Sequence, residues 1–442
     1  MLTRISGAAD QRGAAAAVKD AAFPVPFASG LEYAAPARGT WNIVHVGMLI
    51  PQAHQIFVCA QGCLRGVVLT AAEMGAQERF STIAIEEHNV LEGDLEALLV
   101  EGVSDILARL PRRPPVVLVY TSCVHHFLAC DLELAYRTLR ERFPEVDFVD
   151  CYMNPIMRKS GLTPDQLMRR QLYAALKPRP REENAVAILG NCFPLDETGD
   201  LIRMLRAGGR TVRDITLCRS YAEYQAMAGC AACVTTLPAA RAGGDALAKR
   251  LGMTHLYLPA CWGYDEISRH LDALAAALDL PREEDGPAIA LAEEALAAAR
   301  RVVGDCPIVI DYTATPRPLG LARLLLEHGF HVTAVYADSF TGEEAEDFRW
   351  LQAHAPELTL HPTVQVKMRV LPRRTGEKTL AVGQKAAYFT GSRFFVNMVE
   401  GGGLYGFDGV RRMARLLVDG YLHERDTRTL IQVKGLGCGC CV

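Results

Sequence analysis

Cysteines provide the first candidates for chemistry in this chain of 442 residues, which contains 14 of them. Three lie in two short segments: Cys59 and Cys63 in HQIFVCAQGCLRGV (54–67), and Cys123 in YTSCVHHFLACDLE (120–133). Thiolates from separate loops can share an iron–sulfur cluster, because iron accepts soft sulfur ligands. Zinc is the alternative metal, but the chain has no paired CxxC…CxxC spacing. The spacing therefore allows a metal cluster without defining it.

Other cysteines and two histidines are further candidates. Cys230 and Cys233 form a CxxC pair, but the apolar segment around them is typical of a buried turn that leads into a strand. Cys261 follows an apolar strand and is expected to form a pocket wall or to approach a cofactor. His125 and His126 come just after the TSC segment and are expected either to relay protons or to cap a helix.

The C-terminal sequence GLGCGCCV (435–442) places Cys438, Cys440 and Cys441 among glycines. Closely spaced thiols on a flexible backbone can wrap a soft metal ion or form a redox-active tail. The alternative is an exposed tail without a function. The sequence leaves these possibilities open.

The elements that must position these residues repeat one theme, an apolar strand that ends in small or polar residues and is followed by a helix. The theme occurs at 114–142, 184–207 and 306–328. Alternation of strands and helices at this spacing predicts parallel sheets in an α/β fold. In such sheets, ligands bind beyond the carboxyl ends of the strands. The candidates that occupy these positions are Cys123, Cys192, Cys218, Cys261 and Arg317.

The chain is expected to fold into three Rossmann-like domains. The proline-rich and charged segment at 177–184 and an alanine-rich helix at 287–303 suggest the boundaries. The predicted organisation is an N-terminal extension at 1–40, a domain with the three cysteines at 41–180, a second domain at 181–300, and a third at 301–442 that carries the cysteine-rich tail.

Composition and charge exclude several classes of protein. Apolar residues make up 50% of the chain and charged residues 22%, and the net charge is −4, so no basic field favours nucleic acid. No GxGxxG or GxxxxGK(S/T) motif follows a strand, so ATP chemistry must come from another protein. Polar residues interrupt the longest uncharged stretch, 39–64, which opposes a membrane span. Asp10 and Asp20 oppose a signal peptide, and a cytoplasmic location is expected.

The motifs around the cysteines resemble those of the nitrogenase component 1 superfamily. The QGC segment, the segment EEHNVLEGDLEAL (86–98) and the strand that ends in TSC follow one another as in that family. The resemblance implies that Cys63 and Cys123 ligate an iron–sulfur cluster at a subunit interface. The family's earlier cysteine is missing, and Cys59 is expected to take its place. A 4Fe-4S cluster and an 8Fe-7S-like cluster are therefore both possible.

The C-terminal part is similar to the alpha-type subunit of the same family. The segment DYTATPRPLGLARLLLEHGFHV (311–332) is similar to one in which an arginine hydrogen-bonds the active-site cofactor, which implies that role for Arg317. LYGFDGVRRMARLL (404–417) is similar to a second segment of that subunit. The resemblance thus extends over most of the chain and favours an alpha-like, cofactor-bearing subunit with three Rossmann-like domains.

The ligands of this second, complex iron–sulfur cofactor differ from the family pattern. TLCRSYAEY (216–224) resembles the motif of the cofactor cysteine, which implies that Cys218 is a ligand, although strand counting favours 235–237. Nitrogenase alpha subunits also carry a ligating histidine shortly before the second segment. The corresponding stretch here, VNMVEGGG, has no histidine, so Asn397, Met398 or Glu400 are expected to face the cofactor.

The resemblance implies an oxidoreductase, the catalytic component of a nitrogenase-like two-component system. Its partners would be a paralogous beta-like subunit, in an α2β2 heterotetramer, and a separate ATP-hydrolysing iron–sulfur reductase. The missing histidine argues against dinitrogen as the substrate. A methylthio-alkane is the expected small-molecule substrate, cleaved reductively to methanethiol and a hydrocarbon. The alternatives are a tetrapyrrole reductase subunit and a non-catalytic scaffold for the assembly of a complex iron–sulfur cofactor.

Overall fold

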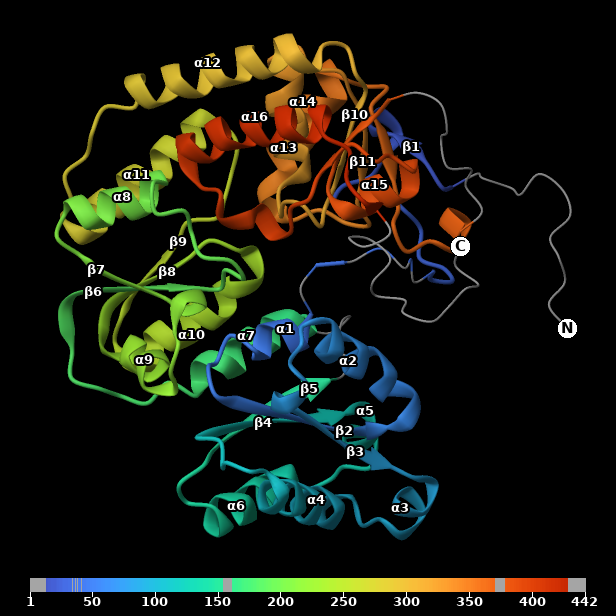
Figure 1. Cartoon of the computed structure of the whole chain (residues 1–442), viewed down its shortest axis with the longest axis vertical. Helices are drawn as coiled ribbons and strands as arrows, with labels where there is room; N and C mark the ends of the chain where they lie inside the picture. Colours follow the sequence, from blue (N-terminus) through green and yellow to red (C-terminus); the bar gives the residue numbers. More distant parts are fainter. Residues whose placement is uncertain are drawn as a thin grey trace, which may run out of the picture. The chain divides into compact units, whose positions relative to one another are not determined.

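The computed structural model shows an α/β protein with three sheets (Figure 1). The described residues are 13–33, 35, 37, 39–40, 42–153, 161–369 and 378–427. The chain forms two compact units. We name them the inserted unit (Trp41–Pro194 and Gly209–Pro259) and the terminal unit (Met1–Thr40, Leu195–Gly208 and Ala260–Val442). The expected α/β fold with parallel sheets is confirmed.

The first sheet of the inserted unit is parallel and has the strand order β3-β2-β4-β5. Its strands are β2 (Ala53–Ala60), β3 (Phe80–Ile85), β4 (Val116–Ser122) and β5 (Asp147–Met153). The helices around it are α1 (Ile43–Gly47), α2 (Gln61–Glu73), α3 (Glu87–Glu92), α4 (Leu95–Arg109), α5 (Cys123–Phe127) and α6 (Leu132–Arg142). Strands β2 and β4 are buried over almost their whole length, as parallel strands covered on both faces are.

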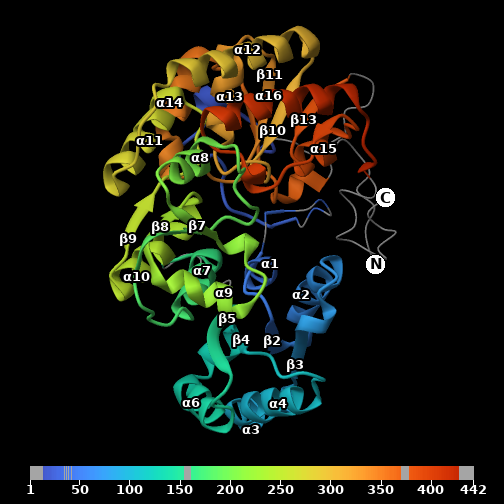
Figure 2. The same ribbon diagram turned by 60° about the vertical axis from the view of Figure 1, so that its left-hand side comes forward.

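Alternate residues of β2 and β4 belong to two different cores. Ile56 and Val58 pack in the core formed with α4 and α6, which lie together on one side of the sheet (Figures 1 and 2). Phe57 and Cys59 pack in the core formed with α1 and α2. Because strand side chains alternate between the faces of a sheet, this pattern fixes the register of both strands. It also directs the Cys59 side chain to the α1 and α2 side.

The second sheet of the inserted unit is also parallel, with the order β7-β6-β8-β9. Its strands are β6 (Glu182–Leu189), β7 (Thr211–Asp214), β8 (Cys230–Thr235) and β9 (Thr254–Tyr257). Its helices are α7 (Pro164–Ala174), α9 (Tyr221–Ala226) and α10 (Arg241–Leu251). Helix α7 contacts both β5 and α10, and one core cluster contains residues of both sheets, so the two sheets are parts of one unit.

The sheet of the terminal unit has the order β1-β12-β11-β10-β13-β14, and only the β1–β12 pair is antiparallel among the described strands. Its strands are β1 (Ala16–Ala17), β10 (Ile308–Asp311), β11 (Val332–Tyr336), β12 (Thr359–His361), β13 (Leu380–Val382) and β14 (Phe395–Val396). Its helices are α8 (Asp200–Ala207), α11 (Tyr264–Leu278), α12 (Gly286–Val303), α13 (Pro318–Glu327), α14 (Ala345–His354), α15 (Gln384–Thr390) and α16 (Gly406–Leu422).

The buried carboxylate of Asp311 joins the end of β10 to the start of α15. It accepts hydrogen bonds from the backbone N–H groups of Thr313 and Ala386. Gly383 approaches it so closely, at φ +108°, that a β-carbon there would lie 2.3 Å from the carboxylate. This position therefore requires glycine.

Three further expectations from the sequence have different outcomes in the structure. No helix among the described residues is long and apolar enough to cross a membrane. The predicted boundaries near 180 and 300 stay predictions, although α8 and the two terminal segments belong to one compact unit. The tail cysteines Cys438, Cys440 and Cys441 lie outside the described residues.

Candidate functional site

The three cysteines of the first candidate site lie at the carboxyl edge of the first sheet. Cys59 is the next-to-last residue of β2, and Cys63 lies in the first turn of α2. Cys123 begins α5 directly after β4. Strands β2 and β4 are neighbours, with Val58 paired to Thr121, so both strands end at the same edge. The fold thus brings together three residues from segments far apart in the sequence.

These three thiols differ in exposure. Cys59 is fully buried, Cys123 is half-buried and Cys63 is exposed. Burial raises the pKa of the Cys59 thiol to about 12, and the negative charges of Cys63 and Cys123 add to the rise. Such a charge effect requires the three sulfur atoms to be near one another. A bound metal would reverse this preference, because metal ligation stabilises the thiolate.

The three sulfurs are not all as close together as the ligands of a single bound ion usually are. Two thiolates on one tetrahedral zinc ion lie about 3.8 Å apart. Within the described part of the chain, the only three ligand groups that all lie within 4.8 Å of one another are Cys261, Glu266 and His270. Cys59, Cys63 and Cys123 are therefore more widely separated. Their soft donors and their place at the sheet edge fit an iron–sulfur cluster.

The helix after Cys123 shows one of the two expected roles for the neighbouring histidines. His125 is buried, and its Nδ1 accepts a hydrogen bond of 3.2 Å from the Ser122 backbone N–H, as in a helix cap. Burial also lowers the pKa of His125. Beyond it, Phe127 and Leu128 expose 67% and 43% of their surface. An exposed apolar edge therefore adjoins the half-buried cysteine.

Cys218 lies in the inserted unit, just after β7 and a short 3-10 turn (Ile215–Leu217). Its Sγ is 3.6 Å from the Asp214 carbonyl oxygen and 3.8 Å from Met227 Sδ. Burial, aided by the charges of Glu223 and Asp214, raises the pKa of the Cys218 thiol to about 11. Its described contacts are those of a half-buried thiol at the edge of a core.

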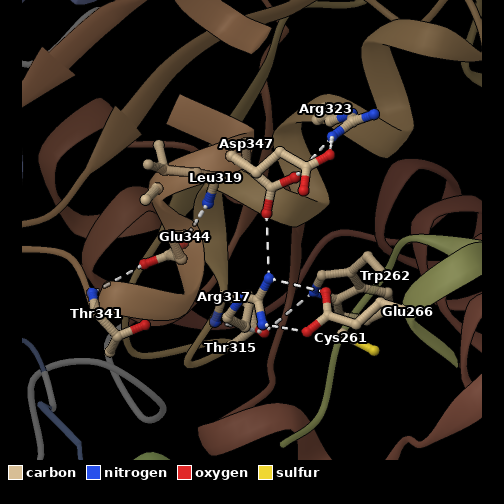
Figure 3. Close-up of polar contacts among 12 residues, drawn as sticks. Cys261, Trp262, Glu266, Thr315, Arg317, Leu319, Arg323, Thr341, Glu344 and Asp347 are labelled. Atoms are coloured by element: carbon tan, nitrogen blue, oxygen red, sulfur yellow. Dashed lines mark hydrogen bonds and ion pairs between the residues drawn. The ribbon is translucent and has the colours of Figure 1, made fainter. Parts of the chain in front are cut away.

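Arg317 lies in the terminal unit, immediately before α13, and is almost fully buried (Figure 3). Its Nη1 and Nη2 donate to the two carboxylate oxygens of Glu266 at 3.0 and 3.1 Å. Nη2 also donates to Asp347 at 3.3 Å. Among the described residues, Arg317 Nε has no hydrogen-bond partner. The Nε donor of this guanidinium thus remains for a ligand.

The carboxylates around Arg317 form a network that we call the arginine network (Arg317, Glu266, Asp347, Glu344 and Arg323). Burial lowers the pKa of Arg317, but hydrogen bonding and charge from Glu266, with the charges of Asp347 and Glu344, outweigh it and raise the pKa overall. Burial raises the pKa of Glu344 to about 8, although its carboxylate accepts from the Leu319 backbone N–H at 2.9 Å. The positive charges of Arg317 and Arg323 are thus met by carboxylates within the network.

Residues 396–403, the stretch expected to replace the missing histidine, form a tight turn beside the loop before Arg317. The backbone N–H groups of Glu400 and Gly401 donate to the carbonyls of Thr313 and Ala314 at 2.8 and 2.7 Å. Met398 is buried, whereas Asn397 is exposed and accepts from the Gln384 side chain at 2.6 Å. The structure therefore brings this stretch and the loop before Arg317 together.

Sequence reasoning missed the residues near Cys261. This cysteine is buried, as expected for a pocket wall, but its Sγ lies 3.7 Å from His270 Nδ1. His270 and Glu266 are four residues apart on α11. The Glu-x-x-x-His spacing after a cysteine at a strand end was the available signal. Cys230 and Cys233 are buried in β8, which confirms their expected place in the core.

Comparison with known proteins identifies the family of this chain. A family model described as "Nitrogenase component 1 type Oxidoreductase" matches residues 44–399. The chain belongs to this family. Oxidoreductases of the nitrogenase component 1 type bind iron–sulfur clusters, and the family also includes non-catalytic members.

Two solved structures have the same fold as this nitrogenase component 1 family member. One, titled "Nitrogenase Cp1 at pH 6.5", has a TM-score of 0.67 and 13% identity and covers 89% of this chain and 94% of its own. Another, titled "Nitrogenase Cp1 at pH 5", has a TM-score of 0.57 and 12% identity, with coverage of 93% and 94%. None of the curated proteins compared with the chain matches it. The family expected from the sequence motifs is therefore confirmed.

Proposed function

We propose that this chain is a subunit of the catalytic component of a nitrogenase-like two-component reductase, in which Cys59, Cys63 and Cys123 hold an iron–sulfur cluster. The observation that carries the proposal is the convergence of these three thiols at the carboxyl edge of one parallel sheet. Membership of the nitrogenase component 1 family supports it. When bound, the cluster supplies one-electron redox chemistry.

The chain's own residues have separate tasks at this cluster. Cys59 supplies a ligand from the buried side, and Cys63 and Cys123 supply ligands from the rim. An exposed ligand beside the apolar Phe127 and Leu128 suits a cluster covered by a second protein. The proposed cover is a paralogous beta-like subunit in an α2β2 complex, with a separate ATP-dependent reductase as the electron donor. The cluster then lies where electrons pass between subunits.

The proposed substrate is a methylthio-alkane. The overall reaction breaks the carbon–sulfur bond with two electrons and two protons, and yields methanethiol and a hydrocarbon. The support is the buried Met398 and the glycine-rich turn (401–403) where nitrogenase alpha subunits have a ligating histidine. An apolar wall suits a small thioether, because it excludes water and offers no competing charge.

A non-catalytic scaffold for cofactor assembly is the second candidate. The ion pairs of Arg317 favour it, because both Nη groups already bind carboxylates of this chain and Nε is the nitrogen without a partner among the described residues. A scaffold needs to hold a cofactor less tightly than an enzyme. The second cofactor, with Cys218, Arg317, Asn397 and Met398 around it, stays a prediction from the sequence.

Anaerobic purification of the chain with its partner subunit tests the proposal. We expect bound iron and acid-labile sulfide in the pair, and ATP-dependent release of methanethiol and hydrocarbon when the reductase and a methylthio-alkane are added. Gas chromatography measures both products. A pair with intact clusters that releases neither product would refute the substrate and favour the scaffold. A pair without iron would refute the cluster proposal itself.

A further inference from the structure

A second group of metal-ligating side chains lies in the terminal unit, apart from the three cysteines already discussed. Cys261 precedes α11, and Glu266 and His270 lie one helical turn apart on that helix. Residues four apart share a face of a helix, so both side chains point in the same direction. Cys261 is buried, and the other two are partly buried.

The three side chains are close enough for one ligand atom of each to approach the same ion. A sulfur, one ring nitrogen and one carboxylate oxygen of the group all lie within 4.8 Å of one another, and the Cys261 sulfur is 3.7 Å from His270 Nδ1. A thiolate and an imidazole on one tetrahedral zinc ion are about 3.6 Å apart. The side chains therefore need little movement to enclose a metal ion.

The ion pair of Glu266 with Arg317 does not prevent ligation. A carboxylate has about four lone-pair positions, and the two hydrogen bonds from Arg317 use two of them. Metal-binding carboxylates are commonly held by such a second hydrogen-bond partner, which fixes their orientation. Figure 3 shows Glu266 between Arg317 and the Cys261 side chain. Arg317 thus positions the carboxylate beside the thiol.

A cleft of about 600 Å³ adjoins the group, and Glu266, Trp262 and Arg317 are among its lining residues. Seven carboxylates and three arginines line this cleft, so its field favours cations. The cleft gives a metal ion a route to Glu266 and supplies water as a fourth ligand. Three protein ligands with one open position are the usual arrangement of reactive zinc sites.

We propose that Cys261, Glu266 and His270 form a Zn²⁺ site, with a water molecule from the cleft in the fourth position. Zinc binds all three donor types, Cys sulfur, His nitrogen and Glu oxygen, and the negative charges of one thiolate and one carboxylate balance the ion. Binding replaces the Cys261 thiol proton by the metal, and one proton leaves to solvent. No electron transfer is required. The site is independent of the proposed reductase function.

Metal titration of the full-length chain tests this site. Zn²⁺ and the spectroscopic probe Co²⁺ are added to metal-free wild-type protein and to the Cys261→Ser, His270→Gln and Cys306→Ser variants. Cys306 is the matched control, because it is a half-buried thiol of the same unit outside the group. Thiols elsewhere in the chain bind metal equally in all four proteins, so the difference between variants is the measured quantity.

We expect wild type and Cys306→Ser to bind one more equivalent than Cys261→Ser and His270→Gln. The thiolate-to-cobalt charge-transfer band of that equivalent disappears in Cys261→Ser, and Arg317→Lys weakens its affinity by about 10- to 100-fold. Zn²⁺ raises the melting temperature of wild type more than that of His270→Gln. Circular dichroism shows whether each variant is folded. If Cys261→Ser does not fold, His270→Gln still tests the site, because His270 is only partly buried. Equal stoichiometry in wild type and a folded His270→Gln would overturn the proposal.

Discussion

The cysteine edge of the inserted unit (Cys59, Cys63 and Cys123) and the arginine network of the terminal unit differ in how their buried side chains are stabilised. At the cysteine edge, the fully buried Cys59 thiol lies near two more accessible thiols, and the negative charges of those two thiols help to raise its pKa. In the arginine network, Arg317 is equally buried, but Glu266 and Asp347 hold its charge. In the first region the charges that act on Cys59 are those of the neighbouring thiols, whereas the second contains its own counter-charges.

This difference indicates which region depends on a ligand from outside. A buried ionised group is stable only when it is paired or coordinates a metal. The arginine network meets that condition with side chains of the same unit, so its structure is complete when the chain folds. At the cysteine edge, the raised pKa keeps the Cys59 thiol protonated, and the proposed metal cluster would supply the positive charge that stabilises its thiolate. The two regions should therefore respond differently to the removal of single side chains.

The largest effect is expected at the cysteine edge. Cys63→Ala and Cys123→Ala should each lose most of the cluster iron and weaken assembly with the partner, because ligand loss also removes folding free energy. Cys130→Ala is the matched control, since Cys130 is half-buried and only seven residues beyond Cys123. Iron and sulfide analysis after anaerobic purification measures the effect. Full iron retention in both ligand variants would contradict the assignment.

A smaller but still large effect is expected in the arginine network. Arg317→Met leaves Glu266 and Asp347 without their buried counter-charge and should lower the free energy of unfolding by about 3–5 kcal/mol. Arg323→Met should cost less, about 1 kcal/mol, because Arg323 is more exposed than Arg317 and its buried partner Asp347 keeps the ion pair with Arg317. Urea unfolding of the metal-free variants compares them. Similar losses in both would show that Arg317 is not the main counter-charge of the network.

The exposed apolar edge beside Cys123 should contribute to association with the partner subunit and not to folding of the chain. Phe127→Ser removes a side chain that is 67% exposed, so the stability of the isolated chain should stay within about 0.5 kcal/mol of wild type. Affinity for the partner subunit should fall by about 2 kcal/mol, or roughly thirtyfold. Calorimetry of unfolding and of subunit association gives the two values. Unchanged partner affinity would place the interface elsewhere.

The smallest effect concerns pH. The folded-state pKa of Glu344 is raised to about 8 from 4.5, mainly by burial, so the folded protein binds its proton more tightly than the unfolded chain. The resulting stabilisation is complete below about pH 4.5 and is lost as the pH rises to 8. Glu344→Gln should flatten this slope between pH 5 and 8. Melting temperatures across that range would reveal it, and parallel slopes in both proteins would reject it.

The cysteine edge could be predicted because its determinants are local. The apolar run of β4 ends at Ser122, and the run of β2 ends close to Cys59, so the carboxyl ends of two strands are visible in the sequence. Topology then brings those ends together, because the carboxyl ends of parallel strands share one edge of a sheet. The strand–helix pairs β4–α6, β6–α8 and β10–α13 followed from the same local pattern.

The arginine network could not be predicted in this way. Arg317 and Glu266 are 51 residues apart, and no spacing rule connects a loop before α13 to one face of α11. Asp347 adds a third distant segment, and its charge is paired only after the helices pack. Resemblance to a family suggested a role for Arg317 toward a cofactor, but the partners of its guanidinium depend on tertiary contacts alone.

The short strand β1 has a consequence for the order in which the protein can be made. Ala16 pairs with Leu360 in an antiparallel bridge, and His361 bonds to Ala14 across 347 residues of sequence. On the ribosome, the segments of the inserted unit emerge before the C-terminal strands, and domains generally fold in the order of synthesis. Residues 14–17 must therefore wait, unpaired, until the sheet that receives them has been translated. Completion of the terminal unit is thus a late, long-range closure step that requires synthesis of the chain beyond residue 361.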